Sequence, residues 1–254
     1  MEFHKDKLIE LLYLKENWER NPQFLPQHFV PEAVDPQSDE YKIFLFTFCF
    51  LTPRNNSTRL IEEIRQILKQ GSNVRDIFSQ ILRRRNMPVM RKYKLWFNTS
   101  VKSLGAWDNI SDFEKWDSVS SFVEARGKKF PGWGPKIYSL YRMTLDEMSG
   151  IRAPFDAFPV DVHIIRVLKN FEIFDPGNKQ VCIKRVEKFI RLNIADFLQE
   201  QNMRPWELHN PMWYLGSQRC SRCAPLFCDL ATRSCNHLKN STKDYWTGIL
   251  SRKR

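Results

Sequence analysis

The sequence has no apolar run that approaches the roughly 20 residues needed to cross a bilayer, and it has no internal repeat or low-complexity segment. Its first residues, Met1 to Lys5, do not open like a signal peptide, so we expect an intracellular protein without a membrane partner. Acidic residues are the minority, with 29 Asp and Glu against 40 Lys and Arg and a formal net charge of +11. This balance favours a polyanionic partner such as nucleic acid.

Basic residues gather in several short clusters along the chain. The clusters are Arg83 to Arg85, Arg91 and Lys92 with Lys94, Arg126 with Lys128 and Lys129, and Arg252 to Arg254. Such spacing is expected where separate segments meet one phosphate backbone, although any single cluster is also typical of a solvated face. The 13% aromatic content, with 8 Trp, indicates that this basic surface covers a packed globule.

Apolar spacing predicts an almost entirely helical protein. The run Ile43 to Leu51, IFLFTFCFL, is apolar on every face and no partner strand follows it, so we interpret it as a buried helix. Other helical periods cover 8–14, 60–68, 74–84, 92–104, 112–125, 179–192, 194–202 and 205–215, with helices also starting near Pro135 and Val162. We expect an all-α, two-lobed fold, with a helical barrel domain over 38–150 and a second domain formed by 1–37 and 151–254.

The segment Phe130 to Lys136, FPGWGPK, predicts a tight hairpin between two helices. Gly132 and Gly134 allow a sharp turn with exposed backbone N–H groups, and Pro135 suits the first position of a new helix. Lys136 then lies in the first turn, where a neutral amine would be a nucleophile. Taken alone, an ordinary exposed lysine at a helix start is the better interpretation.

A carboxylate stands before the next predicted helix. In Pro159 to Leu168, PVDVHIIRVL, Asp161 occupies the position from which a side-chain oxygen caps free backbone N–H groups. Capping alone explains an aspartate there. A carboxylate fixed in this way is also placed to stabilise a cationic sugar or to assist proton transfer.

Taken together, FPGWGPK and PVDVH resemble the helix-hairpin-helix and aspartate signature of the endonuclease III and 8-oxoguanine DNA glycosylase superfamily. The resemblance implies that Lys136 is the Schiff-base lysine of an enzyme that also cuts the strand, and that Asp161 is the family aspartate. It also implies that Gly132, Gly134 and His163 contact DNA. One departure is the interval of 25 residues from Lys136 to Asp161, which is longer than is usual in the family. We place the surplus in 148–158, where Gly150 and Pro154 break the helix.

An Arg- and Asn-rich loop follows the buried helix. The segment Phe50 to Leu60, FLTPRNNSTRL, resembles the loop that fills the gap left by an extruded base in the 8-oxoguanine branch. The matching positions, all expected to contact DNA, are Arg54, Asn55, Asn56 and Arg59. The same residue types also suit an ordinary polar turn.

Four cysteines lie close together near the end of the sequence. Cys220, Cys223, Cys228 and Cys235 follow the pattern C-x2-C-x4-C-x6-C within 216–236, so four thiolates can converge on iron-sulfur or zinc. Endonuclease III and its adenine-specific relatives hold a [4Fe-4S] cluster in a terminal loop, but with the spacing C-x6-C-x2-C-x5-C. The preceding WYLGSQRC resembles the helix that leads to that cluster, which favours [4Fe-4S] over zinc. We expect the metal to be structural.

The sequence therefore predicts a bifunctional DNA glycosylase and abasic-site lyase of base excision repair, acting as a monomer on double-stranded DNA that contains damaged bases or abasic sites. The wedge-like loop favours 8-oxoguanine as the substrate, whereas the cysteine loop favours oxidised pyrimidines. Two alternatives stay open: a non-catalytic helix-hairpin-helix DNA-binding protein with structural zinc, and a monofunctional glycosylase. An intracellular, DNA-associated location follows from each.

Overall fold

The computed structural model describes residues 1–13, 35–52, 57–84, 110–126, 133–175 and 182–219. Over these residues the chain is mostly helical, which confirms the predicted all-α class. It divides into two compact units: unit 1 comprises Met1–Arg20 and Val160–Arg254, and unit 2 comprises Asn21–Pro159. Each unit is described by itself below.

Unit 2 begins in the described residues with α2 (Asp39–Leu51), the helix predicted from the apolar run, and it is buried along most of its length. The Ser38 hydroxyl accepts a hydrogen bond from Tyr41 N at 3.2 Å and so caps its first turn. The buried residues of α3 (Ser57–Lys69) and α4 (Ile77–Arg84) join the same hydrophobic core, and the 3-10 turn η4 (Val74–Asp76) directly precedes α4. The prediction of a buried helix over Ile43 to Leu51 is confirmed.

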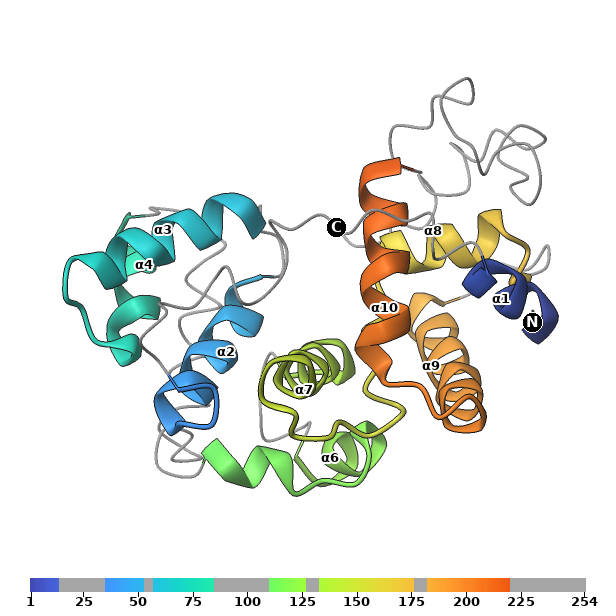
Figure 1. The fold of residues 1–254 in the computed structure, drawn as a ribbon, viewed down its shortest axis with the longest axis horizontal. Coiled ribbons are helices and arrows are strands. Elements are labelled where there is room, and N and C mark those ends of the chain that lie inside the picture. Colours follow the sequence, from blue (N-terminus) through green and yellow to red (C-terminus); the bar gives the residue numbers. More distant parts are fainter. Residues whose placement is uncertain (14–34, 53–56, 85–109, 127–132, 176–181, 220–254) are drawn as a thin grey trace. The chain divides into compact units, whose positions relative to one another are not determined.

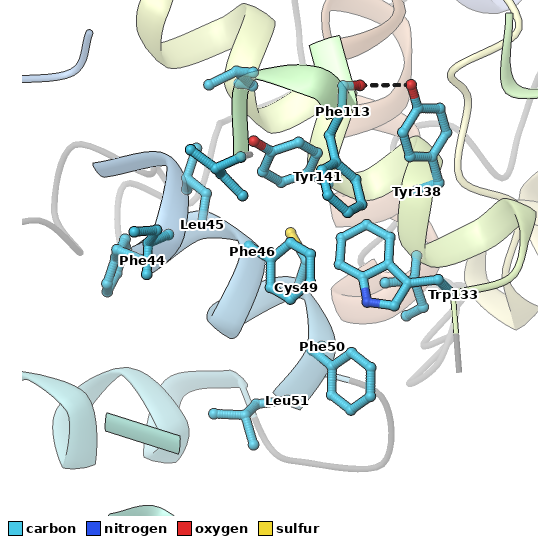
Figure 2. Packing of buried hydrophobic residues seen from close by; sticks show 14 of the residues in the cluster. Phe44, Leu45, Phe46, Cys49, Phe50, Leu51, Phe113, Trp133, Tyr138 and Tyr141 are labelled. Atoms are coloured by element: carbon cyan, nitrogen blue, oxygen red, sulfur yellow. Dashed lines mark hydrogen bonds between the residues drawn. The ribbon is translucent and has the colours of Figure 1, made fainter. Parts of the chain in front are cut away.

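The centre of this core is aromatic. Trp133 is fully buried, and its indole stacks on Phe46 of α2 with ring centroids 4.3 Å apart. Figure 2 shows this indole among the rings of Phe46, Phe50 and Phe113. Rings of this size dominate the burial energy of a core, so Trp133 anchors the residues that follow it to unit 2.

Helix α7 (Pro135–Ser149) starts two residues after this anchor and ends at Gly150, whose φ of 68° is left-handed. Its buried Arg142 donates to the carbonyl oxygens of Phe113, Trp116 and Arg152 and to the Tyr138 hydroxyl. Asp146 Oδ2 accepts from Ala153 N at 3.0 Å. Helix α7 therefore holds the start of the segment that follows it, and this segment belongs to unit 2 as far as Pro159.

The helical period predicted over 112–125 is interrupted in the structure. A 3-10 helix, η5 (Ile110–Glu114), is followed by a break, and α6 (Val119–Arg126) then begins. The buried Asp156 carboxylate accepts hydrogen bonds from Val119 N at 2.8 Å and Ser120 N at 3.1 Å. An acceptor 37 residues away fixes this helix start, and local periodicity does not encode it.

Replacing Asp156 with alanine is expected to lower the free energy of unfolding by about 2–3 kcal/mol, because the buried Val119 N–H and the part-buried Ser120 N–H lose their acceptor. Urea unfolding followed by circular dichroism measures this loss. Asp117→Ala is the matched control, since Asp117 is exposed and lies just before α6. An equal loss in both variants would contradict the capping role.

Unit 1 combines the first residues of the chain with its second half. Strand β1 (Glu2–Phe3) pairs antiparallel with β2 (Phe174–Asp175), and Lys5 forms an ion pair with Glu200. In Figure 1 its helices are α1 (Lys5–Tyr13) in blue, α8 (Val162–Asn170) in yellow, and α9 (Ile183–Glu200) and α10 (Pro205–Tyr214) in orange. A π-helix, η6 (Leu215–Arg219), continues from α10.

The two helices predicted over 179–192 and 194–202 are wrong as separate elements, because α9 is continuous from Ile183 to Glu200. Asn193 lies inside it, and its side-chain amide donates to Phe189 O one turn earlier, at 2.7 Å. Asparagine therefore continues the helix here instead of ending it. Within the described residues, no helix is long and apolar enough to cross a membrane.

Candidate functional site

The start of α7 carries the predicted nucleophile. Gly134 is the N-cap, Pro135 is the first helical residue, and Lys136 follows with an exposed side chain. Gly134 O accepts from Ile137 N at 3.1 Å and Tyr138 N at 3.2 Å, which closes the first turn. The exposed lysine is thus set between the buried Trp133 and the buried face of α7.

Gly134 has open space around it. A Cβ atom built on this residue meets no heavy atom within 4 Å, and its φ of −85° suits any residue. Neither internal packing nor backbone strain therefore requires glycine here. The missing side chain instead leaves room for an external group to approach the helix N-terminus.

The start of α8 carries the predicted aspartate. Asp161 is the N-cap, and its Oδ1 accepts from His163 N at 2.9 Å and from Ile164 N at 3.0 Å. The other oxygen, Oδ2, accepts from Trp213 Nε1 at 3.1 Å. The capping role predicted for Asp161 is confirmed, and a tertiary contact from α10 is added to it.

His163 lies in a second layer of contacts at the same helix start. Its half-buried ring meets the Trp213 indole edge to face, with centroids 5.6 Å apart and planes at 74°. Arg166 donates to Gly216 O at 2.6 Å, and His163 Nδ1 lies 3.4 Å from that same oxygen. These contacts tie α8 to η6, the element that leads to the first cysteine of the predicted metal loop.

Gly216 makes this junction possible. A Cβ atom on Gly216 would lie 2.3 Å from His163 O and 2.8 Å from His163 C, which are both backbone atoms. The two segments therefore approach more closely than any residue with a side chain permits. Gly216 differs in this from Gly134, where the space is open.

Several predicted site residues lie outside the described residues. These are the loop positions Arg54, Asn55 and Asn56, the hairpin residue Gly132, and the four cysteines Cys220, Cys223, Cys228 and Cys235. Arg59 belongs to α3, but its side chain is not described, so the wedge-like loop stays a prediction. Among the described residues, no three His, Cys, Asp or Glu side chains form a group that could hold a metal ion.

The two cysteines outside the cluster differ in setting. Cys49 is fully buried in the core of unit 2, and burial raises the pKa of its thiol, which disfavours the thiolate that metals and electrophiles require. Cys182 is exposed and stands at the N-cap of α9. Cys182 is therefore a suitable control position for experiments on the cysteine cluster.

The structure brings Asp161 and His163 together in unit 1, whereas Lys136 and Gly134 belong to unit 2. Sequence reasoning missed the contacts that Trp213, Arg166 and Gly216 make with α8. The sequence feature that could have indicated them is Gly216, a glycine within a helical run just before the cysteines. No family model, curated protein or solved structure matches the chain.

Proposed function

We propose that this chain is a DNA glycosylase with abasic-site lyase activity, in which Lys136 is the nucleophile and Asp161 stabilises the cationic sugar. The observation that carries the proposal is the position of both residues at helix starts. Helix α7 begins one residue before Lys136 and α8 one residue after Asp161, as the two motifs require. In the proposed enzyme, Lys136 and Asp161 act on the same nucleotide.

In the proposed reaction, the Lys136 amine attacks C1′ of the damaged nucleotide. The bond from C1′ to the base breaks, and the base leaves with the bonding electrons and takes up a proton. Opening of the sugar ring gives an imine between Lys136 and C1′, and loss of a C2′ proton then expels the 3′ phosphate. In this reaction Asp161, whose carboxylate accepts from three N–H donors, stabilises positive charge on the sugar.

The open space at Gly134 supports a phosphate contact at the start of α7, where backbone N–H groups and the helix dipole favour an anion. We further propose that His163 and the loop with Arg54, Asn55, Asn56 and Arg59 contact the same DNA, the loop as a wedge beside a flipped nucleotide. The substrate class is an oxidised base, either 8-oxoguanine or an oxidised pyrimidine. The net charge of +11 favours this polyanionic partner.

Borohydride trapping tests this proposal. The full chain is incubated with duplexes that each carry one 8-oxoguanine, one oxidised pyrimidine or one abasic site, and sodium borohydride reduces any imine to a stable amine. A covalent complex on the abasic duplex and on at least one lesion duplex is the expected result. Base release without trapping would indicate a monofunctional glycosylase. The absence of both base release and trapping would reject the enzyme.

A non-catalytic DNA-binding protein is the second candidate, favoured by the confirmed capping bonds of Asp161, which explain that residue without chemistry. In that case the duplexes bind and no product or covalent complex forms. The cysteine cluster would then hold structural zinc.

For the enzyme, we propose a structural [4Fe-4S] cluster on Cys220, Cys223, Cys228 and Cys235. The purified protein is expected to be brown with broad visible absorption and about four irons per chain. Cys220→Ser or Cys228→Ser should remove most of the iron and lower the melting temperature, because a thiolate ligand is lost. Cys182→Ser should keep the iron content and the melting temperature of the unmodified chain. A colourless protein that contains zinc would contradict the cluster.

A further inference from the structure

Trp213 fixes the orientation of the Asp161 carboxylate. The two capping bonds to His163 N and Ile164 N hold only Oδ1, so they leave the carboxylate plane free to tilt about that oxygen. The bond from Trp213 Nε1 to Oδ2, at 3.1 Å, supplies the second fixed point. With both oxygens held, the carboxylate plane has one preferred direction.

The indole is itself held in place. Its ring meets the His163 ring edge to face, with an angle of 74° between the two planes. Helix α10 packs against α8, so Trp213 is held by a helix other than the one that Asp161 caps. Its N–H donates to a charged acceptor in a half-buried setting, where such bonds are stronger than between neutral groups. The bond from Trp213 to Asp161 lies within unit 1.

We propose that Trp213 is a positioning residue, which sets the direction in which Asp161 presents its charge to the reacting sugar. This inference rests on the proposed lyase function. Electrostatic stabilisation depends on a group being fixed before the reaction begins, so the loss of one fixed point lowers the rate of the chemical step more than the binding of DNA.

The test replaces Trp213 with 3-benzothienylalanine, an isostere that keeps both fused rings but has sulfur in place of the N–H. A duplex with one abasic site is used, and the single-turnover rate of borohydride trapping is measured beside the DNA dissociation constant. The rate is expected to fall about tenfold to a hundredfold, with the dissociation constant changed less than about threefold. The same replacement at Trp206, seven residues earlier on α10, is the control and should leave the rate unchanged.

A double-mutant cycle with Asp161→Asn separates positioning from packing. In the Asp161→Asn background the isostere at Trp213 should change the rate less than about twofold, because the carboxylate that it orients is already gone. An equal loss in both backgrounds, or full activity of the Trp213 variant, overturns the positioning role while the lyase function stands. If the unmodified chain forms no trapped complex, the proposed function fails and this role fails with it.

Discussion

Lys136→Gln is expected to abolish borohydride trapping on abasic-site DNA and to slow strand cleavage by at least about a thousandfold. Glutamine keeps the length and the polarity of the side chain, but its amide nitrogen is not a nucleophile. The Lys136 side chain is exposed at the start of α7, so its replacement should leave the melting temperature nearly unchanged. Gel quantification of the covalent complex measures the effect.

Lys115→Gln is the matched control for this change. Lys115 is an exposed lysine of the same unit, with 73% of its side chain accessible, and pairs with Asp112 at 2.5 Å. Each variant removes one positive charge, so each should weaken DNA binding to a similar small extent. Trapping that persists in Lys136→Gln would assign the imine to another amine, and base release that persists without trapping would assign a monofunctional reaction.

The starts of α7 and α8 were predictable because their signals are local. Pro135 fixes the backbone angle of a first helical residue, and Asp161 supplies a side-chain oxygen two and three residues before the N–H groups that it caps. The apolar run of α2 likewise predicts that this helix is buried. These signals act within one or two helical turns, so a single sequence carries them completely.

The contacts around Asp161 were not predictable in the same way. Trp213 is 52 residues from Asp161, and nothing in WYLGSQRC specifies which acceptor its indole meets. The capping of α6 by Asp156 has the same origin, since the acceptor lies on the segment after α7. Such bonds depend on how distant helices pack, which periodicity does not encode.

The segment between Lys136 and Asp161 shows what the long interval contains. Helix α7 occupies the interval as far as Ser149, and Gly150 ends the helix as predicted. Arg142 and Asp146 of α7 bond to Arg152 and Ala153 in the segment that follows, and Asp156 in that segment accepts from Val119 N at the start of α6. The surplus is therefore built into the core of unit 2. Ala153, Asp156, Ala157 and Phe158 are buried, so this segment is a fixed part of the fold.

Gly216→Ala is expected to lower the free energy of unfolding by about 2–4 kcal/mol, because the new methyl group would overlap the backbone of His163. Backbone atoms cannot rotate away as a side chain does, so η6 and the first turn of α8 must separate. That movement stretches the bond from Arg166 to Gly216 O and the bond from Trp213 to Asp161. Trapping should therefore fall together with stability.

Gly134→Ala is the matched control for Gly216→Ala. Its new methyl group meets no atom within 4 Å, so the cost to stability should stay at or below about 1 kcal/mol, the usual difference between glycine and alanine at an N-cap. If a phosphate approaches this helix start, Gly134→Ala should weaken DNA binding although the fold is intact. Urea unfolding and DNA titration of both variants separate the two glycines: an internal contact requires Gly216, and the proposed function predicts an external contact at Gly134. Equal stability of the two variants would contradict the tight junction between α8 and η6.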